Sequence, residues 1–396
     1  MLRVRLVAKR QEYVVEGLMM VPDTAGPKEL QELLNHMLVD APQFVFRLGT
    51  KVLRGQLDLQ LADSGCSKED ICEIGYDLPE EEPRIEASIA EPEWVRAVSA
   101  SDEGVLTGSY DQSVRFYASG STEPVALKGS FDTVTAVSWI NENRLVGGSA
   151  DGSLRVWSRS NPESPEQVLL GHVAAVQCIL VDDSIIYTAD YEGFVCKFST
   201  STEAAVLPVA QSTQRTKKTR YSRPGVAREA IPTQSCIPQK AHESTISGLA
   251  MHEGHLYTFG WDRQIKRWKL PEMVIMATWT APDAISAVSM DGGLAVTGHS
   301  DGSLHVWDFT SSSVSLNGKD AAHTGWVSGV VLDPLDRNRV VSVGTDGAVL
   351  LWDRKDLAVP AATIREACAS KVLCVDWHAD LLAYGGEDKT LAIYRT

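Results

Sequence analysis

Long apolar runs are missing from this chain. No stretch approaches 18 consecutive apolar residues, so the sequence predicts no transmembrane helix. The first residues alternate charged with apolar side chains and lack the apolar core of a signal peptide, which indicates a strand. Hydrophobic residues make up 44% of the 396 residues and charged residues 22%, which is ordinary for globular protein and allows two or three domains.

Paired cysteines and catalytic motifs are missing too. The seven cysteines contain no C-x-x-C pair, which argues against a disulfide framework or zinc site and favours a reducing compartment. No phosphate loop or nucleophile elbow appears. The cluster His252-Glu-Gly-His255 lacks the spacing of a zinc-binding helix and is better explained by a hairpin turn. We therefore expect no enzyme activity, cofactor, small-molecule ligand or intrinsic metal.

One phrase recurs along the chain: a small or hydroxyl residue, an acid, a turn, and alternating apolar residues that end in an aromatic. The aromatics are spaced by 40, 41, 70, 39, 45 and 42 residues, and five of these spacings fit the WD-repeat period of about 40–45. The aromatics are Tyr117, Trp157, Phe198, Trp268, Trp307, Trp352 and Tyr394. An acid precedes each by six positions: Asp111, Asp151, Glu192, Asp262, Asp301, Asp346 and Asp388. The pattern predicts a mostly β protein with a seven-bladed WD-repeat β-propeller over residues 94–396.

Two repeats combine a histidine, a hydroxyl and an acid with the terminal tryptophan. They are His242, Thr258, Asp262 and Trp268, and His323, Ser342, Asp346 and Trp352. Such sets resemble catalytic triads. An active site has no reason to recur, however, whereas a network that satisfies buried polar groups does. We interpret these sets as structural.

Residues 1–78 have a different rhythm. Segments 2–9, 13–21, 44–48 and 71–76 are strand-like, a helix is predicted from Pro27, and a short helical piece lies around 57–62. This order predicts a small α+β ubiquitin-like domain. No Gly-Gly follows Tyr76, so we expect a built-in docking domain and not a conjugable modifier.

Residues 79–93 form an acidic, proline-punctuated linker. Only two residues follow Tyr394, so the last repeat lacks an outer strand of its own. Residues 84–90 carry Ile85, Ala87 and Ile89 at strand spacing. We expect this segment to close the propeller with those three side chains facing inward.

The 70-residue gap contains a basic insert, 211–240, which we expect to be disordered. It has seven basic residues and one acid, a net charge of +6 in a chain whose net charge is −15. Arg215, Lys217, Lys218, Arg220 and Arg223 are candidates for nuclear import or RNA-phosphate contact. A merely solvated loop is the equally weighted alternative.

Several phrases together resemble one family. They are Glu32-Leu-Leu-Asn-His-Met-Leu38, Trp94-Val-Arg-Ala-Val98, Trp261-Asp-Arg-Gln-Ile-Lys-Arg-Trp268, His323-Thr-Gly-Trp-Val-Ser328 and Lys371-Val-Leu-Cys-Val-Asp-Trp377. The chain resembles, over nearly its whole length, the ribosome-biogenesis WD-repeat proteins of the PeBoW complex, the WD-repeat protein twelve family. The resemblance implies a non-enzymatic assembly factor of the large (60S) ribosomal subunit in the nucleolus and nucleoplasm, required for maturation of 5.8S and large-subunit rRNA.

The same resemblance implies partners and one contact residue. The propeller would bind the propeller of the block-of-proliferation protein, which also binds pescadillo, within the pre-60S particle; no membrane is involved. The ubiquitin-like domain would dock on the AAA ATPase midasin, which removes the factor from pre-ribosomes. In the family a loop acid completes the shell of a magnesium ion on midasin. Here that loop reads Gly65-Cys-Ser-Lys-Glu69, so Glu69 is the candidate and Asp70 the fallback.

Two other readings stay open. A Notchless-type pre-60S factor has the same domain order but typically an eighth repeat. A propeller substrate receptor of a cullin ligase often carries Trp-Asp-x-Arg, whereas Trp352-Asp-Arg-Lys355 has its arginine one place early.

Overall fold

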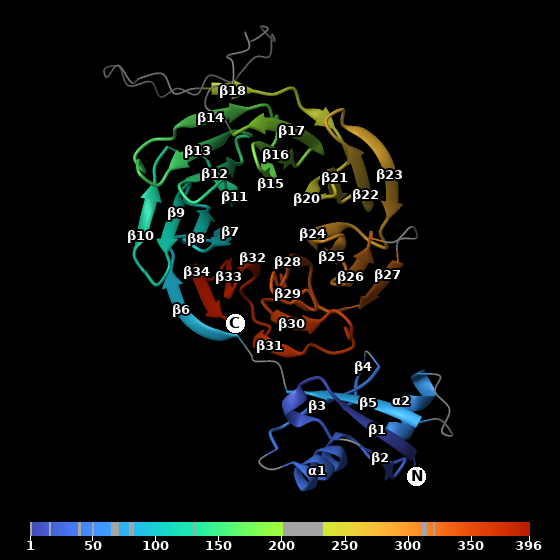
Figure 1. Ribbon diagram of the computed structural model, residues 1–396. Coiled ribbons are helices and arrows are strands. Elements are labelled where there is room, and N and C mark those ends of the chain that lie inside the picture. The colour runs from blue at the N-terminus through green and yellow to red at the C-terminus, as the bar shows by residue number, and fades with distance from the viewer. Residues whose placement is uncertain are drawn as a thin grey trace, which may run out of the picture. The chain divides into compact units, whose positions relative to one another are not determined.

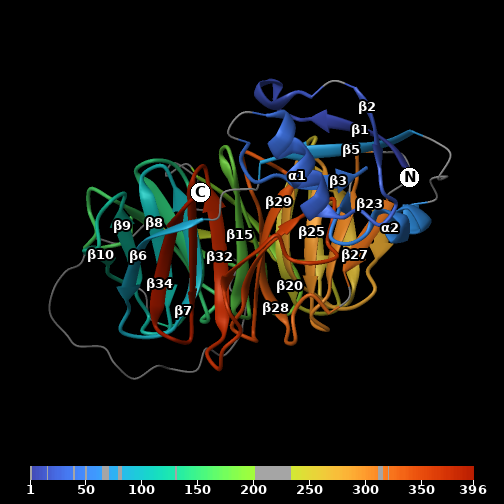
Figure 2. The same ribbon diagram turned by 90° about the horizontal axis from the view of Figure 1, so that it is seen from below.

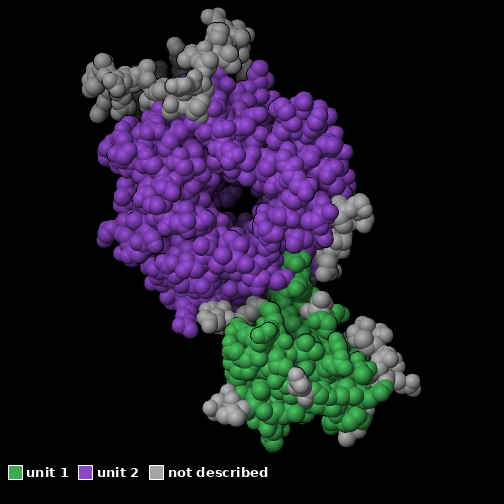
Figure 3. Space-filling view, viewed as in Figure 1, with its two compact units in different colours: residues 1–82, 353–361 green, residues 83–352, 362–396 purple. Residues whose placement is uncertain are grey.

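The computed structural model describes residues 2–15, 17–38, 41–49, 51–64, 71–78, 83–129, 132–200, 233–310, 315–319 and 321–396. The chain divides into two compact units (Figure 3): residues 1–82 with 353–361, and residues 83–352 with 362–396. Among the described residues, no helix has both the length and the apolar character needed to cross a bilayer.

The first unit contains one mixed sheet and two helices. The strands are β1 (Leu2–Ala8), β2 (Leu18–Val21), β3 (Val45–Leu48), β4 (Lys51–Val52) and β5 (Ile71–Asp77), and the helices are α1 (Pro27–Met37) and α2 (Leu57–Ser64). The sheet order is β2-β1-β5-β3-β4, and only the central pair β1 and β5 is parallel. The predicted order of elements is present. The strand predicted for 13–21 is shorter: it begins at Leu18, and Tyr13 belongs to a 3₁₀ turn, Gln11–Tyr13.

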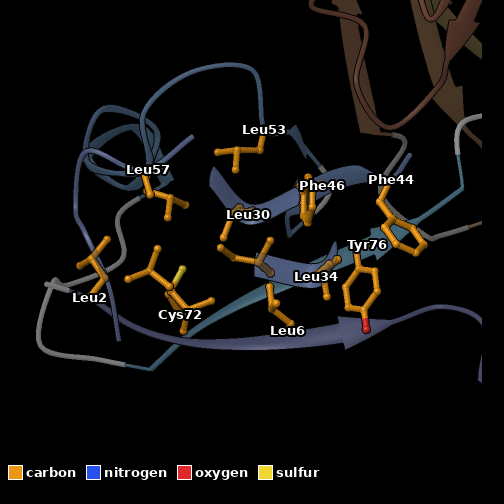
Figure 4. Close-up of a cluster of buried hydrophobic side chains, with 14 of the residues drawn as sticks. Leu2, Leu6, Leu30, Leu34, Phe44, Phe46, Leu53, Leu57, Cys72 and Tyr76 are labelled. Atoms are coloured by element: carbon orange, nitrogen blue, oxygen red, sulfur yellow. The ribbon is translucent and has the colours of Figure 1, made fainter. Parts of the chain in front are cut away.

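Alternation along β1 and β5 explains how this unit buries its core. Both strands bury every second residue, and α1 lays Leu30 and Leu34 over the sheet. Pro27 occupies the first turn of α1, and the Glu29 carboxylate accepts a hydrogen bond from the Gly26 amide at 2.9 Å. The core, shown in Figure 4, contains Leu2, Leu6, Leu30, Leu34, Phe44, Phe46, Leu53, Leu57, Cys72 and Tyr76.

The described part of the second unit forms seven sheets, antiparallel except for one added strand, arranged in a ring in Figure 1 and seen from the edge of the ring in Figure 2. The first sheet contains β7 (Val95–Ser101), β8 (Gly104–Ser109), β9 (Val114–Ala118) and β10 (Pro124–Leu127). The second contains β11 (Val134–Trp139), β12 (Arg144–Ser149), β13 (Leu154–Ser158) and β14 (Gln167–Leu170). The third contains β15 (Val176–Asp182), β16 (Ile185–Asp190), β17 (Phe194–Ser199) and β19 (Gln239–Lys240). The fourth contains β20 (Ile246–His252), β21 (His255–Gly260), β22 (Gln264–Lys269) and β23 (Val274–Thr280). The fifth contains β24 (Ile285–Asp291), β25 (Leu294–His299), β26 (Leu304–Asp308) and β27 (Ser315–Lys319). The sixth contains β28 (Val327–Leu332), β29 (Arg339–Gly344), β30 (Val349–Asp353) and β31 (Ala362–Arg365). The last contains β32 (Val372–His378), β33 (Leu381–Gly386) and β34 (Thr390–Arg395).

The last sheet takes its outer strand from β6 (Arg84–Ala90), which pairs antiparallel with β34. Ile89 is buried at 8% exposure, but Ile85 is 60% exposed, so the prediction that Ile85 faces inward is wrong. The reason is a register shift between Ile393 and Tyr394, which breaks the alternation of side chains along β6.

The prediction of disorder across 211–240 is wrong for its C-terminal part. Residues Thr233–Ser235 form β18, which adds a parallel fifth strand to β14, and β19 completes the sheet of β15–β17. Lys240, counted in the basic insert, lies in β19; its ammonium donates to the Glu192 carbonyl and lies 4.9 Å from the Phe194 ring centre. Residues 211–232 lie outside the described part of the chain.

Candidate functional site

The two complete histidine sets form connected hydrogen-bond chains. His242 Nδ1 lies 2.9 Å from Asp262 Oδ1, and its Nε2 lies 2.6 Å from Thr258 Oγ1, which also accepts from Trp268 Nε1 at 2.9 Å. The carboxylate accepts from Nδ1–H, and the imidazole thereby connects the acid to the threonine hydroxyl. His323, Ser342, Asp346 and Trp352 repeat this arrangement at 3.0, 2.7 and 2.8 Å.

A third set differs from the pattern expected from the sequence. His172 lies 2.9 Å from Asp190 Oδ2 and 2.7 Å from Thr188 Oγ1. The acid that contacts His172 is therefore Asp190, two residues before Glu192, which is the acid at the repeated spacing. Asp190 Oδ1 also accepts the backbone amides of Glu192 and Phe194, so one side chain both holds the histidine and shapes the turn.

These sets are structural. Thr258 and Ser342 are 0% exposed, which leaves no approach for a substrate to either hydroxyl. Burial by itself raises the pKa of the Asp262 carboxyl. The net effect is a lowered pKa, because the carboxylate is stabilised by the hydrogen bond from His242, by the charge of that ring and by two backbone amides. The carboxylate is thus committed to its partners inside the sheet. His252 and His255 face each other across the β20–β21 hairpin, as expected of a turn.

The first sheet satisfies its strand hydroxyl with a carboxylate in place of a histidine. Glu91, at the end of β6, accepts from Thr107 Oγ1 at 2.9 Å, from Tyr117 Oη at 2.7 Å and from Arg115 Nη1 at 2.8 Å. The Glu91 side chain is 0% exposed. Sequence reasoning missed this residue by counting it among the solvated acids of the linker. The sequence did contain one indication: no histidine precedes Thr107 in its repeat, so the buried hydroxyl needs another partner.

A further histidine occupies the sheet of β24–β27 from another position. His299 Nε2 lies 2.8 Å from Thr297 Oγ1, which accepts from Trp307 Nε1 at 2.9 Å, and His299 Nδ1 donates to the Asp283 carbonyl at 3.0 Å. Burial, assisted by the neighbouring His305, lowers the pKa of His299 to about 4. A neutral histidine is therefore built into this sheet.

The end of the insert is anchored beside a cysteine pair. The Cys236 amide donates to the Leu170 carbonyl at 2.9 Å, and the Lys197 amide donates to Cys236 Sγ at 3.3 Å. A hydrogen bond from the Cys196 thiol lowers the pKa of Cys236 to about 7 and raises that of Cys196. Cys236 is thus the thiol of this pair that ionises first.

The candidate contact residues lie outside the described residues. Glu69 and Asp70 belong to the segment 65–70, between α2 and β5, and Arg215, Lys217, Lys218, Arg220 and Arg223 belong to 201–232. The residues that flank 65–70 are described: α2 ends at Ser64, and β5 begins at Ile71, paired with Arg3 in the middle of the sheet. Among the described residues, no group of three His, Cys, Asp or Glu side chains could hold a metal ion.

Comparison with known proteins gives both parts of the chain a relative. The family described as NLE (NUC135) domain matches residues 2–61, and the WD domain, G-beta repeat family matches 122–158 and 274–308. "Ribosome biogenesis protein WDR12 homolog" of Trichoplax adhaerens is 25% identical, covering 100% of this chain and 96% of its own. The protein of that name from Oryza sativa subsp. japonica is 27% identical, covering 94% and 91%.

A solved structure shows the same fold in the second unit. The WD40 beta propeller domain of Doa1 matches with a TM-score of 0.63 at 17% identity, covering 80% of this chain and 98% of that one. Fold and sequence families together define a WD-repeat β-propeller protein with an NLE domain at its N-terminal side. Across the full length of the chain, its curated homologues are named ribosome biogenesis protein WDR12, which confirms the resemblance.

Proposed function

We propose that this protein is a non-enzymatic assembly factor of the large ribosomal subunit, acting in the nucleolus and nucleoplasm in maturation of 5.8S and large-subunit rRNA. One observation carries the proposal: proteins named for ribosome biogenesis match the chain from end to end, through the NLE domain and the propeller in the same order. The burial of the histidine sets supports a non-catalytic role, because their hydroxyls serve the sheets.

The two units have separate tasks in this proposal. The propeller binds the propeller of the block-of-proliferation protein and, through it, pescadillo on the pre-60S particle. The N-terminal unit, a ubiquitin-like roll, docks on midasin, which removes the factor from the particle. A separate core in each unit supports this division, because each can fold around its own buried side chains.

Glu69 carries the midasin contact in the proposal. A magnesium ion prefers oxygen ligands and takes one or two carboxylates from a protein, so a loop acid offered by this chain could complete an open shell on the partner. The segment precedes β5, whose first residue, Ile71, is paired with Arg3 of β1.

The test is binding of full-length Glu69→Ala to the purified metal-site domain of midasin, with and without magnesium. Binding should be abolished, because alanine offers no oxygen to the metal, while the complex with the block-of-proliferation protein stays intact. Glu69→Asp should keep part of the affinity. Glu73→Ala is the matched control, since Glu73 is an acid of β5 whose side chain is 61% exposed and paired with exposed Arg5. If Glu69→Ala and Asp70→Ala both bind like the parent, the contact lies elsewhere.

The basic insert serves nuclear import or contact with ribosomal RNA. Replacing Arg215, Lys217, Lys218 and Arg220 with alanine should leave folding intact and reduce nucleolar accumulation or salt-sensitive binding to pre-ribosomes. Unchanged localisation together with unchanged particle binding would leave only a solvated loop.

A further inference from the structure

One end of the propeller carries a rim of exposed aromatic side chains. In each sheet, the residue after the second strand donates its amide to the carbonyl of the residue before the first strand, as Tyr110 does to Trp94 at 3.1 Å and Thr345 to Trp326 at 2.8 Å. These two positions lie at the same end of every sheet. Aromatics occupy five of them: Trp94, Tyr110, Tyr191, Trp261 and Trp326.

The fold does not require aromatic rings at these positions. Elsewhere in the ring they are filled by Thr133 and Ala150, or by Ala284 and Ser300, with the same backbone hydrogen bond. The rings are poorly buried: Trp94 is 38% exposed, Tyr110 42%, Tyr191 59% and Trp326 52%. Exposed clusters of large aromatics are typical of surfaces that bind another molecule.

The rim is organised into two groups of rings. Trp94 and Tyr110 meet edge to face at 5.4 Å, and Trp261 and Trp326 do so at 5.2 Å. Trp261 and Trp326 belong to sheets separated by the sheet of β24–β27, whose two rim positions hold only Ala284 and Ser300. Small side chains there leave room for the indoles to approach each other.

A hollow of about 560 Å³ lies in the middle of the propeller, and Figure 3 shows the central opening. Tyr191, Trp261 and Trp326 line it together with the beginnings of the inner strands. The second residue of those strands is small and polar in four sheets: Thr135, Ser247, Ser286 and Ser328. Their hydroxyls donate to backbone carbonyls and carry no charge into the hollow.

The other three sheets have Arg96, Gln177 and Leu373 at this position, and only Arg96 is charged. It lies in β7, and it is the one charged side chain among the described residues that line the hollow. Its guanidinium makes one long hydrogen bond, 3.4 Å from Nη2 to Gln177 Oε1, and the described residues give it no ion pair. In contrast, Arg115 of the same sheet is paired with both Glu91 and Asp111. The hollow therefore offers a cation with unused donors inside an aromatic rim.

We propose that this end of the propeller binds a short segment of a partner protein in which an acidic side chain is flanked by apolar residues. The carboxylate enters the hollow and accepts hydrogen bonds from the Arg96 guanidinium, whose planar fork matches a carboxylate. The flanking residues cover the indoles of Trp261 and Trp326. A basic segment is disfavoured, because it would bring a second cation beside Arg96. The inference rests on the propeller alone and is independent of the proposed docking through Glu69.

The test is to select peptides that bind the full-length protein from a phage-displayed library of random twelve-residue peptides. Selected peptides should carry an acid next to aromatic or aliphatic residues, and synthetic copies should bind less tightly at higher salt. Arg96→Gln should weaken binding at least tenfold, Arg96→Lys should restore part of it, and Trp326→Ala should weaken it at least tenfold. Arg84→Gln and Val274→Ala, which change exposed side chains on outer strands, are controls that should bind like the parent.

A pairwise test distinguishes the carboxylate contact from general adhesion. Replacing the acid of the selected peptide with glutamine should weaken its binding to the parent protein. The same replacement should cause no additional loss of binding to the Arg96→Gln variant, because the contact is already absent there. The proposal is overturned if the library yields no binder, if selected peptides are basic or lack an acid, or if they bind Arg96→Gln and Trp326→Ala as tightly as the parent.

Discussion

Replacing Glu91 with alanine in the full-length chain should unfold the propeller far more easily. The carboxylate accepts from Thr107, Tyr117 and Arg115 with its side chain fully buried. Alanine leaves two hydroxyl donors and part of a guanidinium without an acceptor in the interior. Removing one partner of a buried ion pair costs about 3–5 kcal/mol, so we expect a loss of that size in the free energy of unfolding. Glu91→Gln should cost less, since an amide oxygen can still accept.

The measurement is urea unfolding followed by tryptophan fluorescence, with the midpoint compared at constant slope. Glu93→Ala is the matched control: Glu93 lies two residues further on, its side chain is 47% exposed, and it pairs with partly exposed Lys389 at 2.9 Å. Surface pairs of this kind contribute about 0–1 kcal/mol. The reasoning fails if Glu91→Ala destabilises no more than Glu93→Ala.

Three further predictions concern closure, pH and thiol chemistry. Ile89→Ala should cost about 2–4 kcal/mol of unfolding free energy and Ile85→Ala under about 0.5, because the first side chain is 8% exposed and the second 60%; equal melting temperatures would contradict the bulged register. The pKa of His299 is lowered from 6.5 to about 4, so the unfolded chain takes up its proton first and stability should fall, by at most about 3 kcal/mol, as pH drops from 6.5 to 4. His299→Gln should flatten that slope in denaturation at several pH values, and an unchanged slope would exclude His299 as its source. Iodoacetamide at pH 7.5 should modify Cys236, with a pKa of about 7, well before Cys374, whose pKa burial raises to about 12; mass spectrometry that finds Cys374 modified first would refute this order.

The sequence predicted well those features of the structure that depend on residues close together in the chain. Trp268, Asp262 and Thr258 lie within eleven residues, and the β-hairpins between them set their separation, so a repeated spacing indicates a repeated network. His242, which contacts Thr258, lies just before β20, the strand that pairs with the strand of Thr258. The elements of the first unit were predictable for the same reason, because alternation and helical periodicity are properties of consecutive residues.

The parts that the sequence did not predict depend on partners distant in the chain. Glu91 is buried only because β6 pairs with β34, about 300 residues further on. Ile85 is exposed because the register shift falls opposite Ile393 and Tyr394, and no feature of β6 itself announces it. The repeated spacing points to Glu192, whereas the carboxylate that reaches His172 belongs to Asp190, two residues earlier.

Ring closure by β6 gives the molecule a mechanical weak point. The chain enters β6 at Arg84, opposite Arg395, so tension applied along the chain that precedes β6 reaches the propeller at that pair. The ladder hydrogen bonds between β6 and β34 then carry the load. When they yield, the seam opens between the last sheet and the first, and Glu91 is withdrawn from Thr107 and Tyr117 in the same motion. Pulling on the chain that precedes β6 would thus loosen the propeller at this seam, starting with the two sheets that β6 connects.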